Sequence, residues 1–243
     1  MSTLLTGGTG RLGSEILKHL PKTLAPSSRE LDITNRSSVQ SFFNKNKLKI
    51  IIHCAAMTDV CACETDPDQA MKINVTGLMN LLDSCRKYNT KLVYISTDHI
   101  FDGKKGNYKE DDMPNPFGVY AFTKFLGEKI TLLNPKNLVI RTSFIKKFEL
   151  PRAFKNKFFS GDTADVIAKD ITLAVQSDLK GIWNIGGNKV SIYDIAKKLK
   201  PDVLPMKLKD NPINKVGLSY LKDVSLDVSR WQAFKRKANR AKK

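Results

Sequence analysis

The chain has 243 residues, of which 41% are hydrophobic and 27% are charged, so it can form a large folded domain and is not an intrinsically disordered chain. Its 41 Lys and Arg residues outnumber its 24 Asp and Glu residues, which gives a formal net charge of +17, and seven of the basic residues lie in the segment 230–243. No run of about 20 apolar residues is present, which argues against a membrane-spanning helix.

The N-terminus has no basic segment followed by an apolar one, so we expect no signal peptide and a cytoplasmic location. The four cysteines are Cys54, Cys61, Cys63 and Cys85. Disulfide bonds are disfavoured in the cytoplasm, and Cys61 and Cys63 have no second pair at the spacing of a zinc site, so we predict no metal site. Solvated lysines explain the basic composition most simply, and we expect neither a nucleic acid partner nor a membrane partner.

Short apolar segments alternate with helical patterns along the chain. The predicted strands are residues 3–6, 23–25, 50–54, 92–96, 138–142 and 182–185. The predicted helices are residues 10–20, 38–45, 67–88, 119–133, 162–176 and 191–199, the last with Ser191 and Asp194 as a capping box. Continuous apolar strands alternating with helices indicate a parallel sheet covered on both faces. The predicted fold class is therefore α/β, with a Rossmann-type doubly wound parallel sheet.

Two segments do not join this alternation, residues 144–161 and residues 188–243. We expect them to form a small, shortened C-terminal substrate-binding lobe, which ends in a basic tail at 230–243. Residues 1–143 and 162–187 then form the Rossmann domain. Ligands of such folds bind at the edge where the parallel strands end, so the lobe should contribute substrate contacts there.

A glycine-rich turn lies directly between the first strand and the first helix. It reads Gly-Gly-Thr-Gly-Arg-Leu-Gly over residues 7–13, and Gly7, Gly10 and Gly13 have the spacing G-x-x-G-x-x-G. Glycines permit a tight turn and the close approach of a pyrophosphate, which the free N–H groups of the following helix attract. In this strand–turn–helix context, the motif predicts binding of a dinucleotide such as NAD(P).

The end of the second strand indicates which dinucleotide is bound. An acid at this position usually holds the free ribose 2′-hydroxyl of NAD, whereas Arg or small hydroxyl residues accommodate a 2′-phosphate. This chain has Ser28 and Arg29 there, and the first acids after the predicted second strand are Glu30 and Asp32. The pattern favours NADPH, with NADH as the alternative.

Tyr120 and Lys124 form a Tyr-x-x-x-Lys pair at the start of a predicted helix, a spacing that places both side chains on one helix face. A nearby ammonium lowers the pKa of a tyrosine toward the range of acid–base catalysis, so we expect Lys124 to act on Tyr120 in this way. The predicted fourth strand ends at Thr97 and Asp98, which would face the same crevice. A hydroxyl at this position can hydrogen-bond a substrate carbonyl.

These motifs resemble the extended short-chain dehydrogenase/reductases and, more closely, the dTDP-4-dehydrorhamnose reductase family. The similarity runs almost the full length, and its most specific part is residues 96–103, Ser-Thr-Asp-His-Ile-Phe-Asp-Gly. Other matching segments are residues 7–13, 28–34, 54–58, 73–75, 108–112 and 141–144. The resemblance implies NAD(P)H-dependent reduction of a nucleotide-linked 4-keto-6-deoxy sugar, as in rhamnose biosynthesis.

The resemblance also implies roles for individual residues. Tyr120 would protonate the carbonyl oxygen and Lys124 would hold the nicotinamide ribose. Thr97 would position the keto oxygen and, with Asp98 and Phe144, contact the substrate. With the residues argued above, the expected cofactor-binding set is Gly7, Gly10, Arg11, Leu12, Gly13, Ser28, Arg29, Asp32, Ile33, Ala55, Ala56, Thr58, Tyr120 and Lys124.

The chain departs from the family pattern on the sugar side. Phe144 stands where the family usually has Trp, Ala62 stands where it usually has Lys, and the segment after Phe144 is shorter. We find no glutamate set for the magnesium-linked dimer that some members form, and a homodimer stays an open alternative. Two other functions also stay open: a sugar-nucleotide epimerase, and a non-catalytic NADP-binding subunit similar to the regulatory subunit of methionine adenosyltransferase.

Overall fold

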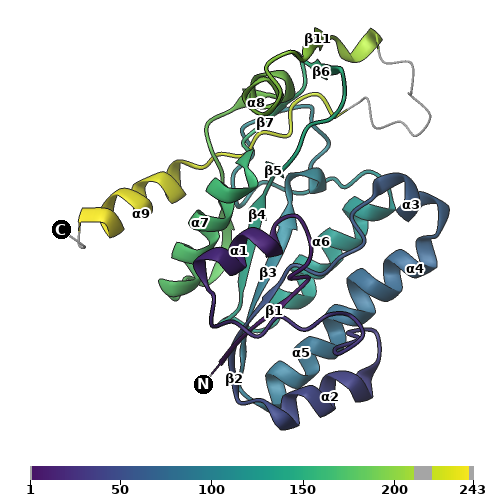
Figure 1. Ribbon diagram of the computed structural model, residues 1–243, viewed down its shortest axis with the longest axis vertical. Coiled ribbons are helices and arrows are strands. Elements are labelled where there is room, and N and C mark those ends of the chain that lie inside the picture. The colour runs from purple at the N-terminus through teal and green to yellow at the C-terminus, as the bar shows by residue number, and fades with distance from the viewer. Residues whose placement is uncertain (1, 211–220, 241–243) are drawn as a thin grey trace.

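A five-stranded parallel sheet forms the centre of the computed structural model, which describes residues 2–210 and 221–240 (Figure 1). The spatial order of the strands is β1 (Ser2–Thr6), β2 (Leu48–His53), β3 (Lys91–Thr97), β4 (Leu138–Thr142) and β9 (Gly181–Asn184). Every neighbouring pair is parallel. These strands match five of the six apolar segments in the sequence, and the predicted Rossmann-type α/β class is confirmed.

The remaining predicted strand, at residues 23–25, is wrong in extent. It is reduced to one parallel bridge in which Leu24 accepts a hydrogen bond from Leu5 N (2.8 Å) and donates one to Thr3 O (2.9 Å). Pro26 has no N–H group and cannot extend the ladder. The bridge places Leu24 beside β1, while the chain later returns to pair β2 with β1. The winding therefore reverses at β1, which is where open α/β sheets bind dinucleotides.

Helices cover both faces of the sheet (Figure 1). Apolar side chains of α1 (Gly13–His19), α7 (Ala164–Gln176) and α9 (Ser229–Arg240) share one buried cluster with the sheet. Those of α2 (Arg36–Lys45), α5 (Gly77–Lys87) and α6 (Val119–Leu132) belong to a second cluster. The apolar strands are thus buried from both sides, as their continuous hydrophobic runs predict.

The helix predicted at residues 67–88 has a bulge in its middle. It consists of α4 (Pro67–Met71), a single π-helical turn (Lys72–Thr76) and α5. A further short helix, α3 (Val60–Thr65), precedes it and was not predicted. A short 3₁₀ turn (Asp98–Ile100) follows β3 directly.

The small lobe lies beyond the ends of β3 and β4 (Figure 1). Its short pairs are β6 (Arg152–Phe154) with β11 (Leu204–Met206), and β7 (Phe158–Phe159) with β10 (Val190–Ser191). Strand β5 (Phe144–Ile145) pairs with β8 (Asp162–Thr163). Helix α8 (Ile192–Leu199) begins at the predicted capping box of Ser191 and Asp194, and a 3₁₀ turn (Leu208–Asp210) ends this part.

The basic tail is mostly the helix α9, and it packs against β9 rather than extending the lobe. The reason is Trp231, which is fully buried among side chains of the central sheet and α7 and donates a hydrogen bond to Asp170 Oδ2 (2.9 Å). The sequence analysis assigned residues 230–243 to the lobe, but α9 packs on the Rossmann domain. Residues 241–243 lie outside the described residues. The division into two domains otherwise stays a prediction.

No helix in the described ranges 2–210 and 221–240 has the length and apolar composition needed to cross a membrane. Within the same ranges, His, Cys, Asp and Glu form no group of three or more that could hold a metal ion.

Candidate active site

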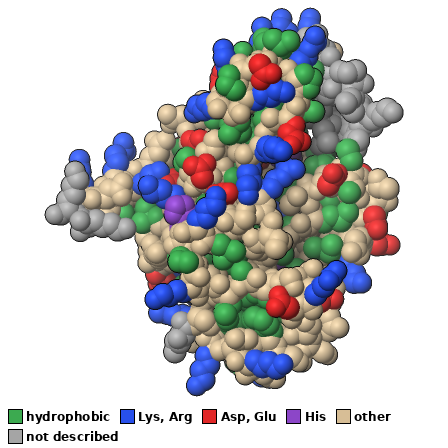
Figure 2. Space-filling model, in the orientation of Figure 1, with side chains coloured by type: hydrophobic (Ala, Val, Ile, Leu, Met, Phe, Trp, Pro, Cys, Tyr) green, Lys and Arg blue, Asp and Glu red, His purple; other side chains and the backbone are tan. Residues whose placement is uncertain are grey.

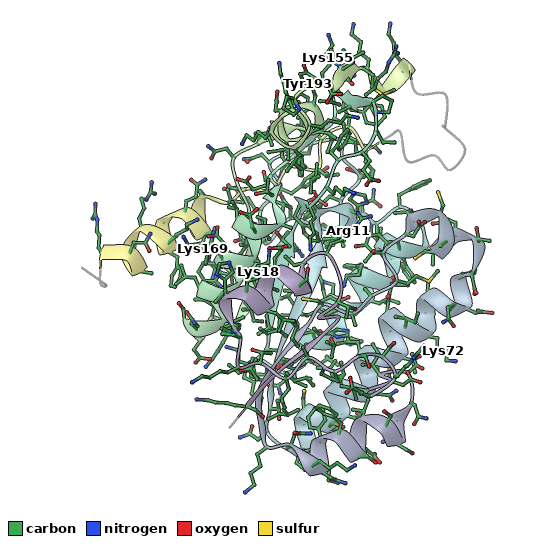
Figure 3. The ribbon with its side chains drawn as sticks, in the orientation of Figure 1. Arg11, Lys18, Lys72, Lys155, Lys169 and Tyr193 are labelled. Atoms are coloured by element: carbon green, nitrogen blue, oxygen red, sulfur yellow. The ribbon has the colours of Figure 1, made fainter. Side chains whose placement is uncertain are left out.

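A cleft of about 1180 Å³ opens where β1, β2, β3 and β4 end. Arg11 lines it from the turn before α1 and Lys72 from the π-helical turn, and both are labelled in Figure 3. Figure 2 shows Lys and Arg side chains gathered across the middle of this face, between the lobe and the Rossmann domain. The sequence-predicted residues that line the cleft are Gly7, Gly10, Arg11, Leu12, Gly13, Ser28, Asp32, Ile33, Ala55, Ala56, Thr58, Thr97, Asp98, Tyr120, Lys124 and Phe144.

The glycine-rich turn has the geometry of a phosphate cradle. Gly7 has φ +74°, and a Cβ added there would lie 2.7 Å from Ala55 N. A Cβ on Gly13 would lie 2.1 Å from Gly7 O. Any side chain at these two positions would therefore displace the backbone. The turn passes straight into α1, and Ser14 N and Glu15 N at the start of this helix donate to Gly10 O (3.1 Å) and Leu12 O (3.0 Å) of the turn. The turn fits the pyrophosphate of a dinucleotide.

The two acids that follow the Leu24 bridge, Glu30 and Asp32, both accept hydrogen bonds from residues close to them in the chain. The Glu30 carboxylate accepts hydrogen bonds from Ser27 N (2.7 Å) and Ser27 Oγ (2.8 Å), which lower its pKa. Asp32 Oδ1 accepts hydrogen bonds from Thr34 N (2.9 Å) and Thr34 Oγ1 (2.8 Å). Ser28 lines the cleft.

Arg29 lies in the same turn as Ser28, where it is exposed and outside the cleft lining. Of the sequence-predicted site residues, it is the one that the structure does not bring to the cleft.

Thr97, Tyr120 and Lys124 come together from two elements, the end of β3 and the first turns of α6. The Thr97 side chain acts on the Tyr120 phenol in the direction that lowers its pKa, and Thr97 Oγ1 accepts a hydrogen bond from His99 N (3.2 Å). The His99 ring meets the Tyr120 ring edge-on, with 6.1 Å between centroids. The hydroxyl groups of Thr97 and Tyr120 therefore line the same cleft, as predicted. The contact between Tyr120 and His99 was not predicted.

The pKa of Tyr120 differs from the sequence expectation. Burial raises the pKa of Tyr120 to about 12, with Asp98 and Cys63 acting in the same direction and the Thr97 hydrogen bond acting against it. Lys124 Nζ donates a hydrogen bond to Ile95 O (2.7 Å), and burial lowers the pKa of Lys124 to about 7. The net shift of the Tyr120 pKa is therefore upward, opposite to the expected direction, because desolvation dominates both groups.

Asp98 lies beside this centre on the side of the small lobe. It is 1% exposed, and its Oδ2 has no hydrogen-bond partner among the described residues. Burial raises the pKa of Asp98 to about 7, while Lys157, between β6 and β7, acts in the opposite direction. Phe144, on β5, lines the cleft near it. Lys157 belongs to no motif, so the sequence offered no signal for it.

Two further residues that sequence reasoning did not assign hold the start of α6. Glu64 Oε1, on α3, accepts a hydrogen bond from Val119 N (2.6 Å), next to Gly118 with its φ of +85°. Asn74, in the π-helical turn, accepts a hydrogen bond from Met57 N (2.7 Å) and donates one to Thr123 Oγ1 (3.0 Å). The turn carrying Tyr120 is therefore tied to α3 and to the chain after β2.

A buried ion pair fixes α6 on the sheet. Arg141 and Glu128 are each 1% exposed, with Arg141 Nη2 at 2.9 Å from Glu128 Oε2. Ser96 Oγ donates to Glu128 Oε1 (2.6 Å), and Arg141 Nη1 donates to Glu110 O (3.0 Å). The network joins α6, β3 and β4 one residue away from Thr97.

The family to which the chain belongs follows from its match to one family model. The family model described as the RmlD substrate binding domain matches residues 1–178. The chain belongs to the RmlD substrate binding domain family.

Among curated members and relatives of the RmlD family, a dTDP-4-dehydrorhamnose reductase of Aggregatibacter actinomycetemcomitans is 33% identical over 241 residues, covering 86% of this chain and 81% of that protein. A methionine adenosyltransferase 2 subunit beta of Bos taurus is 32% identical over 142 residues, covering 54% of this chain and 42% of that protein. The second match thus spans less than half of the relative.

Solved structures with the RmlD fold superpose over nearly the whole chain. A hypothetical dTDP-4-dehydrorhamnose reductase from Sulfolobus tokodaii has a TM-score of 0.84 at 30% identity, covering 96% of this chain and 94% of that one. A dTDP-4-dehydrorhamnose reductase from Bacillus anthracis, in complex with NADP, has a TM-score of 0.84 at 25% identity, covering 96% and 93%. The family resemblance inferred from the sequence motifs is confirmed.

Proposed function

We propose that the chain is an NADPH-dependent oxidoreductase that reduces a nucleotide-linked 4-keto-6-deoxy sugar, in the synthesis of dTDP-rhamnose or a related deoxysugar. The observation that carries this proposal is the convergence of Thr97, Tyr120 and Lys124 in one cleft with the glycine-rich turn. The names of the relatives and the NADP complex of a similar structure support the same reaction and the same cofactor.

In this proposal, Tyr120 is the proton donor to the carbonyl oxygen. With a pKa of about 12, its phenol is protonated at neutral pH, which is the form a donor needs. The Thr97 hydroxyl lines the same cleft and acts on the Tyr120 phenol, so it is placed to hold the carbonyl oxygen. Lys124 donates to the hydroxyls of the nicotinamide ribose. NADPH, when bound, supplies the hydride that reduces the carbonyl carbon.

The reductase proposal is tested by oxidation of NADPH and NADH at 340 nm with dTDP- and UDP-linked 4-keto-6-deoxyhexoses, each with and without a 3,5-epimerase. We expect turnover with one sugar nucleotide and a preference for NADPH. Absorbance of the purified protein separates the epimerase alternative, which would retain its nicotinamide tightly. NADPH binding without turnover of any sugar would contradict the proposal and favour the regulatory-subunit alternative.

Arg29→Ala tests the basis of the cofactor preference. Because Glu30 and Asp32 are engaged by Ser27 and Thr34, Arg29 is the charged group of this turn that can swing to a 2′-phosphate. We expect the variant to weaken NADPH binding about tenfold and NADH binding hardly at all, the size of one charge-assisted contact. Arg36→Ala, an exposed arginine on α2 paired with Asp83, is the matched control. Equal loss for both cofactors would mean that Arg29 does not contact a 2′-phosphate.

The homodimer and the cytoplasmic location stay predictions. Light scattering of the full chain across concentration tests the first, and fractionation of the cells that produce the protein tests the second.

A further inference from the structure

The ammonium of Lys124 is held by an unusual pair of groups. Lys124 is 4% exposed, and its Nζ donates to Ile95 O (2.7 Å) while lying 4.0 Å from the centroid of the Tyr94 ring. The acid on the same helix, Glu128, is engaged by Arg141 and Ser96. An aromatic face and a backbone carbonyl thus take the place of a carboxylate counter-ion.

Tyr94 is itself fixed on three sides. It is fully buried on β3, the residue before Ile95, and its Oη donates to Lys124 O (3.5 Å). The His53 ring stacks with it at 5.9 Å between centroids, and His53 Nδ1 is hydrogen-bonded to Thr6 Oγ1 (2.7 Å). Burial lowers the pKa of His53 to about 3, so the imidazole is neutral and adds no repulsion toward Lys124.

Gly127 shows that α6 is built around the Tyr94 hydroxyl. It lies one turn after Lys124, and a Cβ added there would be 2.1 Å from Tyr94 Oη and 2.5 Å from Tyr94 Cζ. Glycine weakens a helix interior relative to alanine, so its use here has a local cost that the close approach of the Tyr94 ring accounts for.

We propose that Tyr94 is a positioning residue for Lys124, whose ammonium it carries on its ring face beside the Ile95 carbonyl. A cation above an aromatic face is attracted by the ring quadrupole, and most strongly where water is excluded. Because the ring makes no directional hydrogen bond, the remaining N–H groups of Lys124 stay available to the cleft. That these N–H groups bind the hydroxyls of a ribose rests on the proposed function. That Tyr94 positions the Lys124 ammonium does not.

The electrostatic consequence has a definite sign. Burial favours the neutral amine and the Tyr94 face favours the ammonium, so removing the ring lowers the pKa of Lys124 further. The other titratable groups around Lys124 are His53 and Cys54 at the end of β2, and Tyr120 and Glu128 on α6. A substitution of Tyr94 keeps all four of these side chains, and of their contacts it removes the ring on which His53 stacks, which Tyr94→Phe retains.

The test compares Tyr94→Leu with Tyr94→Phe in the full chain. In protein labelled with [13Cε]lysine and without cofactor, NMR follows the titration of Lys124, whose resonance is assigned by its loss in Lys124→Arg. We expect Tyr94→Phe, which keeps the ring, to titrate like the parent protein, and Tyr94→Leu to titrate about one pH unit lower. The resonances of the exposed lysines serve as internal controls.

A second readout is NADPH affinity measured by fluorescence across pH. The affinity is expected to fall as pH rises through the titration of Lys124, and in Tyr94→Leu this fall should move to lower pH by the same interval. If Tyr94→Leu does not fold, Gly127→Ala displaces the ring from the other side and should give the same direction of shift. Unchanged Lys124 titration together with a lowered Tm would overturn the proposal and leave Tyr94 a packing residue. The NMR titration needs neither substrate nor cofactor, so failure of the reductase proposal is seen separately.

Discussion

Tyr120→Phe is expected to lower kcat by a factor of about 10²–10⁴, the usual contribution of a positioned proton donor, and to leave NADPH affinity within about twofold. The substitution removes the phenolic hydroxyl that Tyr120 presents in the cleft lining, at the start of α6 and beside Thr97. Stopped-flow and steady-state oxidation of NADPH at 340 nm measure kcat, and fluorescence titration measures cofactor binding.

Tyr88→Phe is the matched control for this loss. Tyr88 also uses its phenol in a hydrogen bond, to Asn44 Oδ1, but it lies at the end of α5, outside the cleft lining. We expect its kcat to equal that of the parent protein. A kcat for Tyr120→Phe within about threefold of the parent would remove Tyr120 as the proton donor and point to a donor such as Asp98, whose pKa burial raises to about 7.

The elements that sequence alone predicts here are those with local signals. Residues 50–52 and 138–140 are apolar runs of three, and both lie in inner strands of the sheet. The capping box at Ser191 and the glycine spacing at Gly7 also depend on neighbours within a few residues, and both have the expected geometry. Helix α9 has no such signal, because its position depends on Trp231 meeting Asp170, which is 61 residues away in the chain.

The same limit applies to the site. The spacing of Tyr120 and Lys124 predicts that they share a helix face, and they do line one cleft. It does not predict how deeply they are buried, and desolvation reverses the expected direction of the pKa shift of Tyr120. Tyr94 and Glu128 lie outside the motifs, so their contacts with Lys124 and Ser96 become visible only when α6 is placed on β3.

Arg141→Met is expected to destabilise the fold by about 3–5 kcal/mol, because it leaves the Glu128 carboxylate buried without its cation. The guanidinium is 1% exposed and makes three hydrogen-bond contacts to Glu128, as well as one to Glu110 O. Urea denaturation measures the free energy of unfolding. In thermal unfolding, we expect the Tm to fall by about 10 °C for a chain of this size. Below the transition, kcat should fall as well, since Glu128 anchors Ser96 beside Thr97.

Two further variants separate the cost of a lone buried charge from the cost of lost packing. Arg36→Met breaks an exposed ion pair with Asp83, at 67% and 48% side-chain exposure, and should cost less than about 1 kcal/mol. Arg141→Met/Glu128→Leu removes both charges and should be more stable than Arg141→Met alone, although Ser96 Oγ then loses its acceptor. If the loss of stability in the double variant equals the sum of the losses in Arg141→Met and Glu128→Leu, the pair acts by packing. The ionic network is then not what holds α6, with Tyr120 and Lys124, against the sheet.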